Sequence, residues 1–144
     1  MAQVWSDDAV KAAIDLFITV PSQGLDGALI CLFQSNLVID HNLTLAQLLS
    51  AEASFPGYAR QPLGSTHWPP SALTNHVAGS TYNQPITWTC SGGGSTQQMY
   101  GYFVITPSAS KYYLADKFSA GPFSMTNAGD QVTGQISVTS QSHN

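Results

Sequence analysis

The sequence predicts a mainly β protein, an antiparallel β-sandwich or jelly roll preceded by one N-terminal helix. Short runs of β-branched and aromatic residues recur along the chain, and Gly, Pro, Asn and Ser separate these runs. A sustained helical repeat occurs only in the segment before Pro21. We therefore expect a helical arm at residues 1–22 and one β-sandwich domain at residues 23–144.

The predicted helix spans residues 7–19. Ser6 supplies an N-cap hydroxyl, and two aspartates follow it in the first turn, where the helix dipole favours negative charge. Pro21 ends the helix because it biases the preceding residue away from helical geometry. Four apolar residues share one face by their spacing: Val10, Ala13, Ile14 and Phe17. This face indicates a helix that either docks on a neighbouring protein or covers one end of the core.

The strongest strand pattern lies in residues 99–118, which predict a hairpin. Alternation places two tyrosines on one pleat and Phe103 and Ile105 on the other, and Pro107 begins the turn. Other segments must cover the apolar surface of a hairpin this long. Further strands are predicted at residues 28–33, 58–61, 85–90, 123–125 and 131–139, and one helical turn after Thr44. Residues 64–83 are predicted to be long loops with one short strand.

The chain carries little charge. Charged residues make up 8% of its 144 residues, against about 25% in an ordinary soluble domain, and uncharged polar residues replace them. The net charge of −4, with only four Lys and Arg, argues against binding to nucleic acid or to an anionic membrane. We see no signal-peptide pattern and no apolar run that would span a bilayer. Such a neutral surface is expected of a protein in an assembly or outside the cell.

No catalytic constellation is visible, so the sequence predicts a protein that is not an enzyme and holds no cofactor and no metal. Glu52 and Asp116 form a carboxylate pair only if folding brings them together, and no spacing supports that. Three histidines lack metal-ligand spacing and are predicted to be loop residues: His41, His67 and His76. Cys31 and Cys90 lie in apolar segments, which is compatible with two buried thiols or with one disulfide.

Aromatic residues are the candidate contact site. Five are singled out: Trp68, Tyr82, Tyr100, Tyr102 and Tyr112. Rings on one face of a sandwich can stack on sugars, whereas alternating aromatics on strands usually pack across strands or fill a subunit interface. Trp68 lies in a loop, where its indole is either an exposed ligand contact or a buried anchor.

Three segments, residues 32–63, 86–105 and 112–141, carry a resemblance to a known family. Their shared features are an LF..N strand at 32–36, Glu52 ahead of a Gly-Tyr-Ala turn at 57–59, a YGYFV strand at 100–104, and a final segment at 115–130. This pattern resembles a family of small structural proteins of tailed bacteriophages. The resemblance implies a virion component, such as a capsid decoration (cement) protein, a head fibre or a tail-associated module, and it carries over no catalytic residue.

The resemblance and the neutral surface together set the functional expectation. We expect a virion protein, made in the host cytoplasm, that stabilises the head by contacts with the major capsid protein or other virion proteins. A homo-oligomer is expected, and a trimer is compatible with the threefold positions of a capsid lattice. The alternative is a carbohydrate-binding β-sandwich module, receptor-binding or tail-associated, whose aromatic residues contact glycans.

Overall fold

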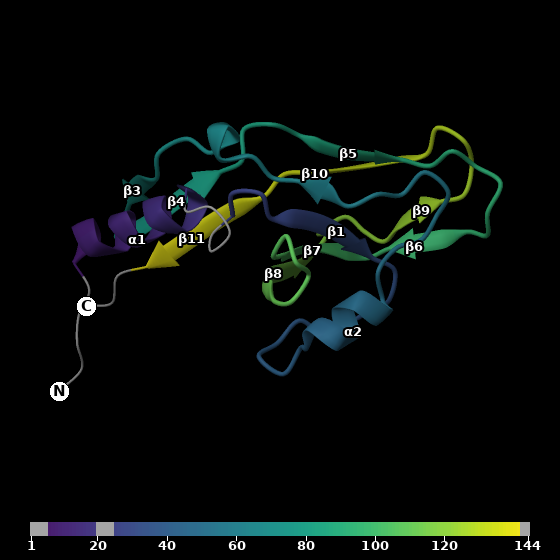
Figure 1. Cartoon of the computed structure of the whole chain (residues 1–144), viewed down its shortest axis with the longest axis horizontal. Helices are drawn as coiled ribbons and strands as arrows, with labels where there is room; N and C mark the ends of the chain where they lie inside the picture. The colour runs from purple at the N-terminus through teal and green to yellow at the C-terminus, as the bar shows by residue number, and fades with distance from the viewer. Residues whose placement is uncertain (1–5, 20–24, 142–144) are drawn as a thin grey trace. The chain divides into compact units, whose positions relative to one another are not determined.

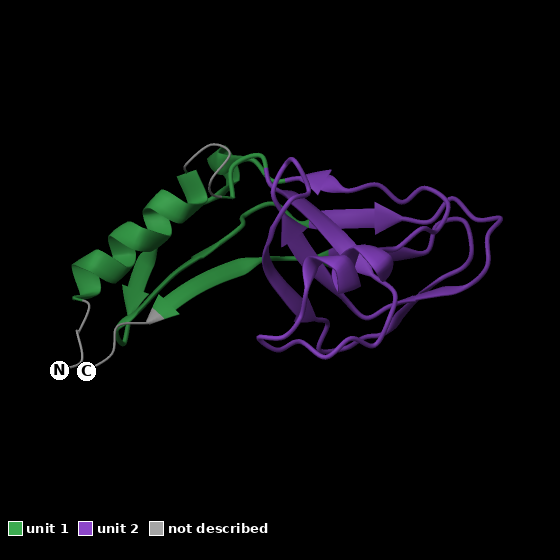
Figure 2. Ribbon diagram, turned by 60° about the horizontal axis from the view of Figure 1, so that its bottom comes forward, with its two compact units in different colours: residues 1–27, 63–85, 134–144 green, residues 28–62, 86–133 purple. Residues whose placement is uncertain are grey.

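The computed structural model describes residues 6–19 and 25–141 and has a mainly β chain with several antiparallel sheets (Figure 1). The predicted class, mainly β with an N-terminal helix, is confirmed. Two compact units are formed (Figure 2): unit 1 comprises residues 1–27, 63–85 and 134–144, and unit 2 comprises residues 28–62 and 86–133. The predicted domain boundary after residue 22 lies outside the described residues. Within the described part, no helix has the length and apolar character needed to cross a bilayer.

Unit 1 is a three-stranded antiparallel sheet with a helix on one face. Its elements are α1 (Asp7–Thr19), a 3-10 turn η1 (Ser65–His67), β3 (Ala72–Thr74), β4 (Val77–Thr81) and β11 (Ser137–Gln141). The strand order is β11-β4-β3, so the C-terminal strand pairs with a strand far away in the sequence. Helix α1 lies against β4 and β11 (Figure 1).

Helix α1 forms where its cap and its apolar repeat predict it. The backbone N–H of Ala9 donates to the Ser6 hydroxyl (3.2 Å), which confirms the predicted N-cap. The buried positions follow the helical repeat: Val10, Ile14 and Ile18. Ala13 and Phe17, which were predicted on the same face, are only half-buried.

Contacts with its own unit hold α1 in place. Its buried face packs on Ala78 of β4, with Val138 of β11 beside it. The Asp15 carboxylate accepts the backbone N–H of Ser71 (2.8 Å) and also pairs with Lys11 (2.9 Å). Of the two sequence-based alternatives for the helix, the structure therefore confirms that it covers core residues of its own chain.

Residues 64–83 require a correction. The sequence predicts long loops with one short strand, whereas the structure has the paired strands β3 and β4. Asn75 and His76, between them, have φ values of 49° and 63°, the left-handed geometry of a two-residue hairpin turn. The sequence of β4, with Gly79 and small side chains, has low strand propensity, so pairing and packing under α1 determine the strand.

Unit 2 is organised around a four-stranded antiparallel sheet of order β2-β1-β7-β8. Its elements are β1 (Leu29–Phe33), α2 (Leu45–Ser50), β2 (Gln61–Pro62), β5 (Ile86–Thr89), β6 (Gln97–Met99), β7 (Gly101–Ile105), β8 (Tyr112–Lys117), β9 (Phe123–Met125) and β10 (Gln131–Gly134), whose last residue belongs to unit 1. The hairpin predicted at 99–118 is confirmed as β7 and β8, with Tyr102 opposite Asp116. The strands β6–β9 and β5–β10 form two further pairs.

One face of the four-stranded sheet carries a core cluster that lies within unit 2. Its buried members are Cys31, Phe33, Leu43, Leu48, Ala51, Phe103 and Ile105. They come from β1, β7, the loop before α2 and α2 itself. Helix α2 begins at a reciprocal cap, because the Thr44 hydroxyl accepts the Gln47 backbone N–H while the Gln47 side chain accepts the Thr44 N–H (2.8 Å). The helical turn predicted after Thr44 is confirmed, and Phe103 and Ile105, which the alternation placed on one pleat, are both buried.

The predicted C-terminal strand at 131–139 is also corrected. The structure divides it into β10, which pairs with β5, and β11, which pairs with β4. The interruption falls at residues 135–136, just after the chain passes from unit 2 to unit 1 at residues 133–134. Gly134 is a local signal near this break, but the partners of the two strands lie far away in the sequence.

Substitution of Gly101 on β7 tests how tightly β7 packs against its neighbours. A Cβ atom there would clash with the Asp116 carbonyl oxygen and lie 2.5 Å from Cζ of Phe33. We expect Gly101→Ala to lower the free energy of unfolding by at least about 1–3 kcal/mol, because backbone and core must shift. Gly64→Ala is the matched control, since its Cβ would meet only ordinary contacts of 3.5 Å and longer. Urea denaturation of both variants measures the effect, and equal stabilities would contradict this packing.

Candidate functional site

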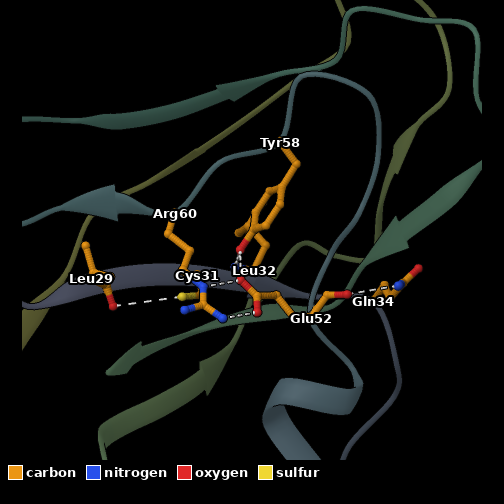
Figure 3. Close-up of polar contacts among 7 residues, drawn as sticks. All are labelled: Leu29, Cys31, Leu32, Gln34, Glu52, Tyr58 and Arg60. Atoms are coloured by element: carbon orange, nitrogen blue, oxygen red, sulfur yellow. Dashed lines mark hydrogen bonds and ion pairs between the residues drawn. The ribbon is translucent and has the colours of Figure 1, made fainter. Parts of the chain in front are cut away.

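The described residues of unit 2 bring one group of ionisable side chains together (Figure 3). Glu52, Tyr58 and Arg60 come from the segment between α2 and β2, and Cys31 comes from β1. The Glu52 carboxylate lies between the Tyr58 phenol and the Arg60 guanidinium (Figure 3). The Glu52 side chain is 14% exposed and that of Arg60 is 34% exposed, so the pair is largely withdrawn from water.

Hydrogen bonds occupy both oxygens of the Glu52 carboxylate. Oε1 accepts from Nε of Arg60 (2.8 Å) and from the Tyr58 hydroxyl (2.9 Å), and Oε2 accepts from Nη2 of Arg60 (2.7 Å). Two parallel bonds from one guanidinium make this a bidentate pair, which fixes orientation as well as charge. The Tyr58 hydroxyl in turn accepts the backbone N–H of Leu32 on β1 (3.2 Å).

The backbone around Glu52 also pairs with β1. Glu52 forms a bridge to Phe33, the Gln34 N–H donates to the Ala51 carbonyl (2.7 Å), and the Ala53 N–H donates to the Leu32 carbonyl (2.9 Å). A turn at residues 55–58 then reverses the chain, with Gly57 at φ +90°. Tyr58 and Arg60 consequently return to the side chain of Glu52. The cluster thus fastens residues 51–60 to the central strand of the sheet.

The protonation states follow from burial and from these bonds. Burial alone would raise the pKa of Glu52, but hydrogen bonds from Arg60 and Tyr58 outweigh it and hold the pKa below its ordinary value. Burial, with the Glu52 charge adding to it, raises the pKa of the Cys31 thiol to about 12. Burial also raises the pKa of Tyr58. At neutral pH the carboxylate is therefore ionised, and the thiol and phenol keep their protons.

This arrangement suits a structural role better than a chemical one. A general acid needs a raised carboxyl pKa, whereas that of Glu52 is lowered; a nucleophilic cysteine needs a thiolate, whereas Cys31 is protonated. Asp116, the other carboxylate considered from the sequence, is exposed on β8, where it accepts the backbone N–H of Lys117 (2.8 Å). The Glu52 carboxylate is held by Arg60 and Tyr58, which suits an anchoring role.

Two of the five predicted contact residues, Trp68 and Tyr82, meet inside unit 1. Their ring centroids lie 5.1 Å apart in an edge-to-face arrangement, and the rings are 6% and 3% exposed. The Tyr82 hydroxyl accepts the backbone N–H of Gly64 (3.1 Å). The Trp68 indole is therefore buried, as the anchor alternative expects. Neither ring leaves a face on which a sugar can stack.

The other three predicted residues belong to unit 2 and are half-buried. Tyr112 packs on the core cluster and its hydroxyl donates to the Leu43 carbonyl (2.8 Å), while Tyr100 packs on the same cluster. Tyr102 lies beside Phe118, with ring centroids 5.9 Å apart, and Phe118 meets Phe123 at 5.4 Å. Burial, and then the nearby charge of Asp116, raise the pKa of Tyr102. Only Tyr102 thus belongs to a row of partly exposed rings.

The structure also shows where the candidate metal ligands and the two cysteines lie. Among the described residues, no three His, Cys, Asp or Glu side chains gather in a way that would hold a metal ion. His76 pairs through Nδ1 with the Asp7 carboxylate (3.0 Å) at the start of α1, and His67 lies against the Tyr82 ring. Cys31 and Cys90 are both buried free thiols, which decides between the two sequence-based alternatives.

The sequence-based prediction did not identify the Glu52–Arg60 pair. Glu52 was noted only as the acidic residue before the Gly-Tyr-Ala turn and as one half of a carboxylate pair. The available signal is that the chain has only four Lys and Arg, and one of them follows Glu52 across a Pro-Gly turn. A short reversal between two opposite charges predicts that they meet.

Comparison of this chain with protein-family models, with curated proteins and with solved structures gives no match. Its function must therefore be inferred from its own residues.

Removing the charge of Glu52 tests its anchoring role. We expect Glu52→Gln to lower the free energy of unfolding at pH 7 by about 1–3 kcal/mol, because Arg60 loses its paired carboxylate in a poorly hydrated position. The folded-state pKa of Glu52 lies below the ordinary 4.5, so its contribution is fully present above pH 4.5 and is lost as the pH falls through the folded-state pKa.

Urea denaturation of wild type and variant from pH 7 down to about pH 3 should therefore give free energies that converge at the acidic end. Asp116→Asn is the control, because it removes an exposed carboxylate and should change stability by less than about 0.5 kcal/mol. A difference between wild type and Glu52→Gln that stayed constant over this pH range would contradict the assignment.

Proposed function

We propose that this chain is a non-enzymatic structural protein of a bacteriophage virion, and specifically a capsid decoration (cement) protein that stabilises the head by contacts with major capsid subunits. The observation that carries the proposal is the chemistry of the exposed strand faces. Uncharged hydroxyl and amide side chains hydrogen-bond to one another there, in four pairs: Thr81–Ser137, Thr87–Thr133, Thr89–Gln131 and Gln98–Ser124.

Such faces are suited to a permanent neighbour. A charged group must lose its hydration when a partner covers it, and interface cores are depleted of charge for that reason. Hydroxyl and amide groups that already bond to each other leave fewer unmet partners when water is excluded. The same composition would give an isolated protein little charge to keep it soluble.

We also propose that unit 2 is a sandwich of the jelly-roll type. The two inner strands of the four-stranded sheet, β1 and β7, are buried on both faces, because Ile30 and Val104 on one face are as inaccessible as Cys31 and Phe103 on the other. Helix α2 and its preceding loop contribute to the cluster on the second face. In the proposed arrangement the β5–β10 and β6–β9 pairs form the second layer over the first face.

The loop between β1 and α2, which carries Asp40, is the proposed contact of unit 2 with capsid subunits. Val38 is 72% exposed in the loop between β1 and α2. It lies at the rim of a surface hollow of about 310 Å³, and a second hollow of about 380 Å³ adjoins α2; Leu37 and Gln47 line both. An apolar tip beside two hollows lined mainly by apolar surface can interlock with a complementary surface, with Asp40 the one charged residue that lines them. The proposed partners are the major capsid protein or other virion proteins, in the virion, with the chain acting as a homo-oligomer.

Binding to capsids tests this function. Purified protein should co-sediment with expanded heads that lack it, and it should raise the temperature at which those heads release their DNA. Val38→Asp should weaken binding by about tenfold or more, because a carboxylate would lose its hydration at the contact. Val38→Thr, of similar shape and uncharged, is the control. No binding of the wild-type protein to heads or other virion parts, together with its absence from purified particles, would refute the proposal.

A carbohydrate-binding module, receptor-binding or tail-associated, is the second candidate. The specific observation in its favour is the row of partly exposed rings Tyr102, Phe118 and Phe123, with the exposed Asp116 opposite Tyr102 as a hydroxyl acceptor. On this hypothesis a glycan array shows saturable binding, and Phe118→Ala abolishes it while Trp68→Phe, in the interior, does not. An array without any bound glycan would eliminate this candidate.

A further inference from the structure

Strand β11 presents an open edge in unit 1. The backbone N–H of Tyr82 donates to the Ile136 carbonyl (2.8 Å), and these residues continue the register in which Thr81 lies opposite Ser137. Hydrogen-bonded and non-hydrogen-bonded pairs alternate along an antiparallel ladder. Val138 and Ser140 therefore turn their backbone groups toward β4. The N–H and C=O groups of three other residues point away from it: Ser137, Thr139 and Gln141.

The outward side of β11 has no strand on it. Within residues 6–19 and 25–141, β4 is the one strand that pairs with β11. The opposite edge of the sheet is different, because the two-residue turn makes Thr74–Val77 the closing hydrogen-bonded pair of the β3–β4 hairpin. On β3 only Leu73 then points outward. The long unpaired row thus belongs to β11.

This edge also lacks the features that protect other edges. In unit 2, the edge strand β8 carries Asp116 and Lys117 and has an irregular register beside Ile105, all of which discourage further pairing. The other edge, β2, is only two residues long and ends in a proline. In contrast, β11 is five residues long, regular, and free of charge and proline. Natural proteins rarely leave such an edge unprotected.

The outward groups of β11 are complementary to those of a second β11. In an antiparallel arrangement about a two-fold axis at Thr139, Thr139 of one copy faces Thr139 of the other. Ser137 then faces Gln141 of the second copy, and Gln141 faces Ser137. All three are outward-pointing residues, so each position forms a hydrogen-bonded pair with two N–H···O bonds. A shift of the register by one residue would oppose outward groups to inward ones and lose these bonds.

We infer that the protein forms a two-fold dimer in which β11 pairs with β11 of a second copy. The joined sheet has the order β3-β4-β11-β11-β4-β3. A two-fold axis normal to the sheet places both α1 helices on the same side. The opposite face is then a continuous uncharged surface, to which each copy contributes Ala72, Thr74, Val77, Gly79, Thr81, Ser137 and Thr139. This interface goes beyond the proposed function, and it is tested on the purified protein without any virion component.

Light scattering coupled to size-exclusion chromatography tests the dimer. Wild-type protein at about 50–100 μM should have twice the 15.3 kDa mass of one chain. Thr139→Pro removes an N–H that β4 does not use, so the fold should persist, whereas the two central bonds of the interface are lost. We expect the dissociation constant to rise by about tenfold or more. Thr139→Ala keeps the N–H and is the control that should remain a dimer.

A charge exchange at the same position tests the register. Thr139→Lys and Thr139→Glu each place like charges directly opposite one another, so each variant alone should dimerise more weakly than wild type. An equimolar mixture should restore the dimer, because opposite charges then meet. A monomeric or trimeric wild-type protein, a dimeric Thr139→Pro variant with native circular dichroism, or a mixture no tighter than its components would overturn the inference.

Discussion

The ion pair between Glu52 and Arg60 is the interaction on which the organisation of unit 2 most depends. Burying a carboxylate that is only 14% exposed destabilises the fold unless its charge is paired and its oxygens are hydrogen-bonded. Arg60 pairs the charge, and Arg60 and Tyr58 together bond both oxygens. To reach Glu52, the chain must reverse at residues 55–58 and return beside β1. The pair thus satisfies a poorly exposed charge and also holds residues 51–60 against β1.

Charged side chains elsewhere in the chain also make specific contacts. Two charged side chains connect segments that lie far apart in the sequence: Asp15 holds α1 to Ser71, and Lys117 reaches Asn36 (2.7 Å). Hydrogen bonds from Asn127 and Thr126 fix Asp130 in its turn and lower its pKa. With charges used in this way, the exposed strand faces consist mainly of hydroxyl and amide groups. The proposed function is argued from the chemistry of these faces.

How much could be predicted from the sequence depended on how local each signal is. The cap at Ser6, the reciprocal cap at Thr44 and the alternation in 99–118 lie within one element, and their elements were predicted correctly. The pairing of β4 with β11 and the division of 131–139 depend on partners far away in the sequence, which no local pattern encodes. The burial of Trp68 could not be predicted for the same reason, because it depends on contact with Tyr82, which lies in another segment.

For the candidate site, the sequence showed the residue types but did not show that Glu52 and Arg60 meet. Glu52 was noted for its place in a motif, whereas its bond to Arg60 required a turn of known geometry between them.

The most direct test of the central claim, that this chain acts as a virion structural protein through uncharged contacts, is cryo-electron microscopy of the intact particle. The account predicts density for the chain on the head shell, with uncharged faces against capsid subunits. A particle map that accounts for every protein density without this chain would contradict it.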